Sequence, residues 1–321
     1  MKRKCIFALL IGAFLLCLCA CGKEPPTAAL CFRQTTDGAY TAYYKTLEDT
    51  LRNAGFQVTV ADAADDQSKQ TAQIDGFAAE KYDLLIVEPV ITASGAELVE
   101  QVKAANIPTV FVNREPEAEA LALWTQVSYV GCDTSKAGIL QGQIILQTPD
   151  KGDINGDGVV SYIVISGPED HLDAQSRTQG CTQLLTDAGV QLSLLSTGCG
   201  DWTEDSGHRL CEQALARYGK DIEVIFCNND AMALGAMAAI EAGGRTVGQD
   251  VYLVGIDALP RALTAVQSST LTGTVSTNMQ AQADQILTVC RALLDAQPVE
   301  KQYYIDYAPV FPENVEVFLP E

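Results

Sequence analysis

From residue 27 onward, short runs of β-branched and apolar residues alternate with longer segments that have helical spacing. The expected strands are AALCFR, FQVTVAD, YDLLIVEP, IPTVFVN, VSYVG, VVSYIVIS, VQLSLLS, EVIFCNN and VYLVGID. The expected helices lie near residues 40–53, 67–80, 93–105, 135–146, 174–188, 203–218 and 231–242. This alternation predicts an α/β protein with two open, doubly wound, mostly parallel sheets covered by helices on both faces. In such sheets, ligands bind beyond the carboxyl ends of the strands.

The first 20 residues carry the pattern of a secretory signal peptide, with basic MKRK followed by the apolar run CIFALLIGAFLLCLCA. This run is shorter than the roughly 20 residues that a membrane-spanning helix needs. Leu18-Cys19-Ala20-Cys21 resembles a bacterial lipobox, which predicts removal of residues 1–20, acylation of Cys21 and a tether over 21–26. The expected location is the outer face of the cell membrane, or the periplasm. An ordinary signal peptide with an incidental cysteine is the alternative.

The charge balance excludes one class of partner. Removal of residues 1–20 takes away Lys2, Arg3 and Lys4, which leaves 18 basic residues against 41 acidic ones and a formal charge of −23. Nucleic acid is therefore not expected as a partner, because its phosphates would be repelled. The apolar content of 47% argues against a disordered chain.

Seven cysteines follow Cys21, and no two of them form a CxxC pair. They are Cys31, Cys132, Cys181, Cys199, Cys211, Cys227 and Cys290. Most lie in strand or helix patterns, which predicts buried free thiols. A disulfide between Cys199 and Cys211 stays open, because spacing alone does not determine pairing.

Polar side chains follow several of the expected strands. They are Asn113, His171, Asp173, Arg177, Asn228, Asn229, Asp230 and Asp257, with Trp202 in the turn GCGDWTEDS. Because the carboxyl ends of parallel strands meet at one edge, we expect these side chains to converge. The hydroxyls of a pyranose both donate and accept hydrogen bonds, and its C–H faces stack on aromatic rings, so the set predicts a pyranose site. Each residue alone also fits a helix cap or a turn.

The segment DINGDGVVSY begins like an EF-hand calcium loop. Asp153, Asn155 and Asp157 occupy positions 1, 3 and 5, and a glycine takes the turn at position 6. Ser161 at position 9 is an oxygen donor, but position 12, where a bidentate glutamate closes such a loop, is Val164. The loop therefore predicts a calcium site that needs a carboxylate from elsewhere. An ordinary Asp/Asn/Gly turn is the alternative.

Several segments spread over most of the mature chain resemble the periplasmic glucose/galactose-binding proteins, which deliver sugar to ABC importers. The segments are DDQSKQTAQID, IPTVFVNREP, YVGCDTSKAGILQG, DINGDGVVSY, GPEDHLDAQSRT, IEVIFCNNDAMALGA and VGIDALPRAL. The resemblance implies a monomer with the type I periplasmic binding protein fold, in which two Rossmann-like lobes are joined by three hinge crossings. The hinges would lie near Cys132–Asp133, Thr277–Met279 and Ala308–Val310. The N-terminal lobe would comprise 27–131 plus 279–307, and the C-terminal lobe 132–278 plus 308–321.

The resemblance also implies the contacts to the sugar. The hydrogen-bonding groups would be Asn113, His171, Asp173, Arg177, Asn229 and Asp257, with Trp202 and Tyr40 stacking on the two faces of the ring. Two positions depart from the family. Gly38 stands where the family has an aspartate, with Asp37 one residue earlier, and Thr277 stands where it has an asparagine, with Asn278 next. Because both departures fall on the side that decides between epimers, glucose, galactose and other pyranoses stay open.

For the calcium loop, the resemblance supplies the missing carboxylate as Glu223 of IEVIF. A structural calcium ion in the C-terminal lobe would then be bound by Asp153, Asn155, Asp157, the backbone carbonyl of Val159, Ser161 and both carboxylate oxygens of Glu223. This all-oxygen set is of the kind that calcium prefers. The family usually has a longer amide in place of Ser161, which predicts a bridging water or weaker binding here.

Three other functions fit parts of the sequence. A sensory binding protein that presents its sugar to a chemoreceptor or a sensor kinase would use the same ligand chemistry. An exported sugar hydrolase would use His171 and Asp173 as acid and base, but the chain has only two histidines and no Gly-x-Ser-x-Gly or metalloprotease motif. A transcription regulator of this fold would need a helix-turn-helix ahead of residue 27, where this chain has a signal peptide pattern. A binding protein without enzymatic activity is the expected function.

Overall fold

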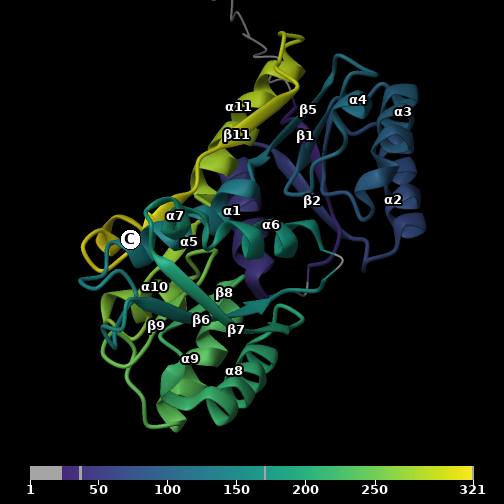
Figure 1. Ribbon diagram of the computed structural model, residues 1–321. Helices are drawn as coiled ribbons and strands as arrows, with labels where there is room; N and C mark the ends of the chain where they lie inside the picture. Colours follow the sequence, from purple (N-terminus) through teal and green to yellow (C-terminus); the bar gives the residue numbers. More distant parts are fainter. Residues whose placement is uncertain (1–23, 36–37, 170, 320–321) are drawn as a thin grey trace, which may run out of the picture.

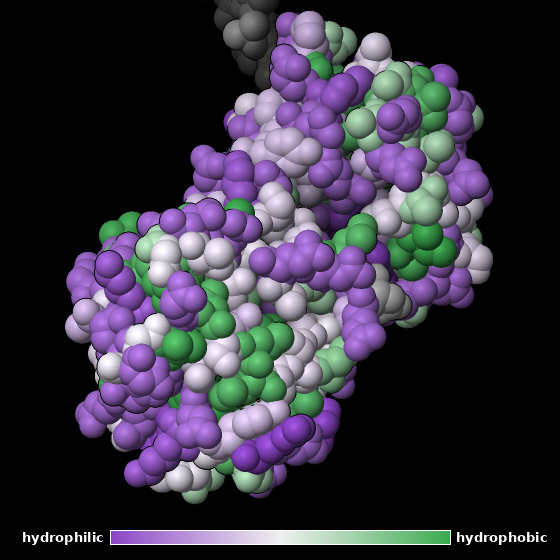
Figure 2. Space-filling model, viewed as in Figure 1, coloured by the Kyte–Doolittle hydropathy of each residue, from purple (hydrophilic) through white to green (hydrophobic). Residues whose placement is uncertain are grey.

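The computed structural model describes residues 24–35, 38–169 and 171–319, and the side chains of residues 38–40 lie outside this description. The predicted signal peptide, Cys21, Asp37 and the side chain of Tyr40 therefore lie outside the described residues. The chain forms two lobes, each with its own parallel sheet (Figure 1). Within the described ranges, no helix is both long and apolar enough to cross a bilayer. Figure 2 shows hydrophilic residues over much of one face of both lobes.

The N-terminal lobe is built on a six-stranded parallel sheet in the order β11-β5-β4-β3-β1-β2. Its strands are β1 (Thr27–Phe32), β2 (Gln57–Asp62), β3 (Leu84–Val87), β4 (Thr109–Val112), β5 (Val127–Cys132) and β11 (Gln302–Ile305). Its helices are α1 (Gly38–Asn53), α2 (Gln67–Ala79), η1 (Thr92–Ser94), α3 (Gly95–Ala105), α4 (Ala118–Leu121) and α11 (Met279–Leu294). Two apolar cores fill this lobe. One gathers around Leu47 and Ile286 under α1 and α11, and the other gathers around Ile74 and Val99 under α2 and α3.

The C-terminal lobe is built on a four-stranded parallel sheet in the order β7-β6-β8-β9. Its strands are β6 (Val159–Ser166), β7 (Gln191–Cys199), β8 (Val224–Cys227) and β9 (Tyr252–Val254), and an antiparallel pair, β10 (Thr274–Ser276) and β12 (Ala308–Val310), lies beside β9. Its helices are α5 (Ser135–Leu146), α6 (Leu172–Gly180), α7 (Gln183–Asp187), α8 (Glu204–Tyr218), η2 (Gly219–Asp221), α9 (Asp230–Ala242), α10 (Pro260–Gln267) and η3 (Val315–Val317). Helices α8, α9 and α10 enclose one core, and α5 and α7 enclose the other.

The chain passes between the lobes three times, from β5 to α5, from β10 to α11 and from β11 to β12. The third crossing lies at Asp306 and Tyr307, just ahead of the predicted hinge at 308–310. The reason is that residues 308–310 already pair with β10 in the C-terminal lobe. Helix α11 returns to the N-terminal lobe, where Ile286, Val289 and Leu293 join the core.

The helix expected over 174–188 is instead two helices, α6 and α7, with a break at Cys181 and Thr182. The break lies where both helices approach α5 closely. A Cβ added at Gly138 of α5 would lie 2.3 Å from the carbonyl oxygen of Arg177, and one at Gly142 would lie 2.8 Å from that of Cys181. Because Gly138 and Gly142 have no side chain, the backbone of α6 and of the following turn can pack closely against α5. A larger residue at either position would prevent this close packing.

The seven cysteines that follow Cys21 are all free, and all of them except Cys199 are buried. Burial raises the pKa of the Cys31 and Cys181 thiols to about 12. The prediction of buried free thiols is thus confirmed for six cysteines, whereas Cys199 is exposed. Cys199 and Cys211 do not form a disulfide.

Candidate ligand-binding cleft

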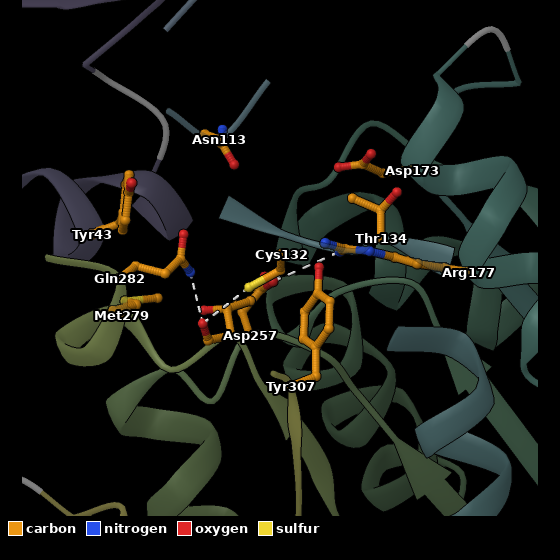
Figure 3. Close-up of a pocket in the computed structure, with 11 residues that line it drawn as sticks. Tyr43, Asn113, Cys132, Thr134, Asp173, Arg177, Asp257, Met279, Gln282 and Tyr307 are labelled. Atoms are coloured by element: carbon orange, nitrogen blue, oxygen red, sulfur yellow. Dashed lines mark hydrogen bonds and ion pairs between the residues drawn. The ribbon is translucent and has the colours of Figure 1, made fainter. Parts of the chain in front are cut away.

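A small cavity of about 50 Å³ lies between the two lobes. The cavity is lined by Tyr43, Asn113, Cys132, Thr134, Asp173, Arg177, Asp257, Thr277, Met279, Gln282 and Tyr307 (Figure 3). A wider mouth shares Asn113, Cys132, Thr134 and Asp173 with the cavity and adds Glu88, Arg114, His171 and Trp202 among its lining residues. The cleft is therefore bounded by both lobes and by the crossover segments.

Most of the predicted sugar-binding residues meet at this cleft. Those that line it are Asn113, His171, Asp173, Arg177, Trp202, Asp257 and Thr277. Arg177 and Asp173 come from the first two turns of α6, His171 precedes this helix, and Asp257 follows β9. The strand-end rule thus brings together residues that are far apart in the sequence.

An arginine–aspartate pair forms the charged part of the C-terminal wall. Arg177 Nη1 lies 3.7 Å from Asp257 Oδ1, and the two side chains are only 8% and 13% exposed. The same Nη1 donates a hydrogen bond to the backbone oxygen of Asn228 at 2.7 Å. Because both charges lie in a partly desolvated wall, their attraction is stronger than that of an exposed pair. A ligand hydroxyl at this point meets both a donor and an acceptor.

A second carboxyl group, Asp230, supports the loop that carries Asp257. Thr274 Oγ1 donates to Asp230 Oδ1 at 2.6 Å, and the backbone N–H of Leu259 donates to Oδ2 at 2.8 Å. Complete burial, together with the negative charge of Asp257, raises the pKa of Asp230 well above its usual range. A Cβ added at Gly255 would lie 2.1 Å from Asp230 Oδ1, so this position needs a glycine. Asp230 is therefore a buried part of the wall's support and does not line the cleft.

Trp202 provides an aromatic face at the mouth of the cleft. Its ring lies 5.2 Å from that of His171 in an edge-to-face arrangement, and the Arg177 guanidinium carbon lies 5.8 Å from its centroid. A Cβ at Gly167 would lie 2.2 Å from the indole, so the glycine makes room for the ring. Trp202 itself has a left-handed backbone, with φ of 70°. The ring therefore packs against His171, Arg177 and the backbone at Gly167.

His171 lies beside this aromatic face. Burial lowers the pKa of His171, and the guanidinium groups of Arg114 and Arg177 act in the same direction, whereas the carboxylate of Asp173 opposes them. The neutral imidazole is therefore favoured. Within the part of the chain that the structure describes, its buried Nδ1 has no hydrogen-bond partner. That nitrogen remains for a ligand or for water.

Two of the predicted sugar contacts cap helices instead of lining the cleft. Asn229 is 2% exposed, accepts a hydrogen bond from the backbone N–H of Met232 at 2.9 Å, and donates one to the backbone oxygen of Trp202 at 3.0 Å. It therefore holds the Trp202 loop against the start of α9. Asn278 caps α11 by accepting a hydrogen bond from the N–H of Ala281 at 3.3 Å. Of the alternatives Thr277 and Asn278, only Thr277 lines the cavity.

The N-terminal wall contains residues that the sequence reasoning missed. Tyr43, on α1, is 5% exposed, and its hydroxyl has no hydrogen-bond partner in the described ranges. Burial raises its pKa, and the nearby carboxylate of Glu88 acts in the same direction. Gln282, on α11, donates to the backbone oxygen of Thr277 at 2.7 Å, beside the Sγ of Cys132, which donates to the same oxygen at 3.4 Å. Glu88 follows β3 directly, so the strand-end rule would have found it.

The predicted calcium loop is tied to Glu223 by hydrogen bonds. The side-chain oxygens of Asp153, Asn155 and Asp157 accept hydrogen bonds from backbone N–H groups two to five residues further along. Glu223, which is 2% exposed, accepts from the N–H of Asn155 at 3.0 Å and from that of Ser161 at 2.8 Å. Nowhere among the described residues do three or more His, Cys, Asp or Glu side chains form a group that could hold a metal.

Two lobes with parallel sheets, joined by three crossover segments around a polar cleft, define a solute-binding protein of the two-lobe class. Residues 29–298 match the periplasmic binding protein domain, and the chain belongs to this family. The fold expected from the sequence is thereby confirmed.

Several proteins similar to this chain are binding proteins. The D-galactose/methyl-galactoside binding periplasmic protein of Haemophilus influenzae is 32% identical over 225 residues, which cover 69% of this chain and 67% of that protein. A putative rhizopine-binding protein of Rhizobium meliloti is 29% identical over 277 residues, which cover 86% of this chain and 84% of that protein.

Among solved structures, an ABC transporter solute binding protein of Bacillus halodurans with bound myo-inositol is 29% identical and has a TM-score of 0.76. The match covers 92% of this chain and 98% of that chain. An ABC transporter periplasmic solute binding protein of Actinobacillus succinogenes, solved with bound D-allose, shares the fold with a TM-score of 0.79 at 20% identity, over 91% of this chain and 99% of its own.

Proposed function

We propose that this protein is an exported solute-binding protein that captures one monosaccharide of the glucose/galactose type and delivers it to an ABC importer. The observation that carries the proposal is the Arg177–Asp257 pair, which lies in one cleft with Asp173 and Asn113. Together these groups offer both donors and acceptors to a ring of hydroxyls. Trp202 at the mouth offers a flat apolar surface to the C–H face of a sugar.

The charges of the cleft favour a neutral ligand. The cavity is lined by the carboxylates of Asp173 and Asp257 and by one cation, Arg177, which already lies next to Asp257. A uronate or a sugar phosphate would bring a further negative charge next to two carboxylates, at a cost in free energy. Hydroxyl groups carry no such penalty. The galactose-binding relative of Haemophilus influenzae supports an uncharged hexose as the ligand.

Binding is expected to close the two lobes. The C-terminal lobe supplies Arg177 and Asp257, and the N-terminal lobe supplies Asn113 and Tyr43. Only a closed arrangement lets one small ligand contact both sets at once, so the ligand stabilises that arrangement by its differential affinity. The closed form is the one that would be recognised by the permease.

The direct test is a calorimetric titration of the purified protein with D-glucose, D-galactose, D-ribose, D-xylose and myo-inositol, followed in parallel by tryptophan fluorescence. Saturable binding of one hexose with no product released supports the proposal. Preferential binding of ribose or myo-inositol would move the ligand to another member of the same class, and hydrolysis of a glycoside would indicate an enzyme. A uronate or a sugar phosphate that binds more tightly than its neutral parent would contradict the argument from charge.

We further propose that Cys21 carries the lipid anchor and that the loop 153–161 binds calcium. The calcium ligands would be Asp153, Asn155, Asp157, the backbone carbonyl of Val159, Ser161 and Glu223. The oxygen donors and the buried carboxylate of Glu223 fit the ion's preference, and each side-chain oxygen that accepts one N–H keeps a second lone pair for a cation. The ion would supply a cross-link between the loop and β8. Detergent partitioning of the expressed full-length chain, compared with Cys21→Ser, tests the anchor.

A further inference from the structure

The amide of Asn113 lies between the cleft and the buried carboxylate of Glu88. Asn113 Nδ2 donates a hydrogen bond to Glu88 Oε1 at 2.6 Å. The other oxygen, Oε2, accepts from the Tyr44 hydroxyl at 2.6 Å and from the backbone N–H of Arg33 at 3.2 Å. Glu88 is completely buried. Three donors therefore point at its two oxygens. Burial raises the pKa of Glu88, and these three hydrogen bonds act in the opposite direction by favouring the ionised carboxylate.

This arrangement decides which end of the Asn113 amide faces the ligand. Asn113 turns its NH₂ group toward Glu88 Oε1, and an ionised carboxylate, which can only accept hydrogen bonds, favours this orientation over the reverse one. Its Oδ1 is then directed into the cleft, as Figure 3 shows. An asparagine without such a partner presents either its oxygen or its nitrogen, because the two ends of the amide have nearly the same shape.

The backbones of both residues are also fixed. The N–H of Glu88 donates to the oxygen of Cys31 at 3.0 Å, and its own backbone oxygen accepts from Gln70 Nε2 at 2.7 Å. Asn113 has a left-handed backbone with φ of 59°, and its backbone oxygen accepts from the Tyr129 hydroxyl at 3.2 Å. Neither residue can move away from the other without breaking these contacts.

We propose that Glu88 is a positioning residue that holds the Asn113 amide with its oxygen toward the ligand, so that the N-terminal wall selects a hydroxyl that donates a hydrogen bond. The inference rests on the proposed function, since it concerns the same cleft. It adds a rule of specificity. A ligand that presents only an acceptor to Asn113 meets the lone pairs of Oδ1 and is rejected.

Monodeoxyfluoro sugars test this rule, because fluorine has nearly the size of a hydroxyl but donates no hydrogen bond. Calorimetry would compare wild type and Glu88→Gln with D-glucose, D-galactose and their 2-, 3-, 4- and 6-deoxyfluoro derivatives. In wild type, fluorine at the position that faces Asn113 should weaken binding by roughly 10- to 100-fold, as expected for a buried acceptor left without its donor. In Glu88→Gln the new amide can donate to Asn113, so Asn113 can turn its NH₂ outward, and the penalty at that position should fall at least fivefold.

Three further variants separate positioning from a merely structural role. Glu88→Asp keeps an acceptor-only group and should keep the penalty, whereas Asn113→Ala should abolish it. Glu100→Gln makes the same chemical change on the exposed face of α3 and should leave every affinity unchanged. If Glu88→Gln weakens all sugars by one common factor, or if the penalty is the same in every variant, the proposal is wrong.

A measurement without ligand keeps this outcome separate from that of the proposed function. In the ¹H–¹⁵N spectrum of the ligand-free protein, the Asn113 side-chain NH₂ signal, assigned by its loss in Asn113→Ala, should show the downfield shift of a proton donated to a carboxylate. Glu88→Gln should remove this shift. If no sugar binds to wild type, the proposed function fails, but this signal still decides the orientation of the Asn113 amide. If the signal does not respond to Glu88→Gln, the positioning role of Glu88 is wrong.

Discussion

The two walls of the cleft are built in different ways. The C-terminal wall carries paired charges and an aromatic face, with Arg177 3.7 Å from Asp257 and Trp202 at the mouth. The inner N-terminal wall presents the uncharged groups of Asn113 and Tyr43 to the cleft, and its carboxylate is buried behind the asparagine. We infer that the C-terminal wall supplies most of the affinity and that the N-terminal wall selects among ligands. Each prediction below tests this division.

The largest effect is expected for Arg177→Met, which removes the cation of the C-terminal wall. Asp257 would keep its negative charge in a wall where its side chain is 13% exposed, and breaking a buried pair in this way costs about 3–5 kcal/mol. Because Asp257 retains some contact with solvent, we expect the lower end of this range. Affinity for the preferred sugar should fall at least about 100-fold, and the melting temperature should fall as well. Calorimetry and thermal unfolding measure the two effects.

Arg261→Met is the matched control for this prediction. Arg261 forms an ion pair with Glu204 on the surface, where its side chain is 68% exposed. Exposed pairs contribute little, so both affinity and melting temperature should stay close to those of wild type. Equal effects of the two substitutions would show that the wall has no special electrostatic role.

The next effect is expected for Gly167→Ala, which acts on the aromatic face and leaves every charged group in place. The new Cβ would lie 2.2 Å from the indole of Trp202, so the ring must move. Affinity should fall by roughly tenfold, and the emission maximum of Trp202 should shift. Gly76→Ala, on the exposed side of α2 with nothing within 4 Å of the new Cβ, should change neither. A shifted spectrum together with full affinity would show that the ring does not contact the ligand.

The C-terminal wall could be predicted from the sequence better than the N-terminal wall, and the reason is structural. Asp257 follows β9 closely, and Asp173 and Arg177 lie in the first two turns of the helix that follows β6, so the topology of a parallel sheet places all three at one edge. Asn229 also follows a strand, yet its side chain caps α9. The segment after a strand is often the start of a helix as well, and the N–H groups of the first helical turn need hydrogen-bond acceptors.

The N-terminal wall depends on contacts between distant segments that no local pattern records. Tyr43 lies inside α1 and Gln282 inside α11, and they meet only because the two helices pack on the same face of the sheet. Glu88 reaches Asn113 across adjacent strands, β3 and β4. Helix α11 could have been predicted, because Ile286, Val289 and Leu293 have helical spacing. Its place in the N-terminal lobe depends on the crossover at 277–278.

A smaller effect is expected for Tyr43→Phe in the N-terminal wall. The hydroxyl has no hydrogen-bond partner in the described part of the chain, so its removal should leave the melting temperature unchanged or slightly raised. If the hydroxyl binds the ligand, affinity should fall by about 2- to 10-fold, with different factors for glucose and galactose. Tyr303→Phe, outside the cleft on β11, is the control. A loss of stability without a change in affinity would assign Tyr43 to the core and not to ligand selection.

The smallest effect on the cleft is expected from calcium, because the loop 153–161 lies outside the cavity lining. An ion that binds only the folded protein, and whose free concentration is 100 times its dissociation constant, adds about 2.7 kcal/mol to the free energy of unfolding. The melting temperature should therefore rise by about 5 °C or more with calcium and fall with EDTA. Glu223→Gln should abolish this response, whereas Glu212→Gln, on the exposed side of α8, should keep it. Sugar affinity should change less than about threefold in either case, because neither wall contacts the loop. If the melting temperature of Glu223→Gln still responds to calcium, Glu223 is not a calcium ligand. A large change in sugar affinity on removal of calcium would show that the C-terminal wall depends on the loop.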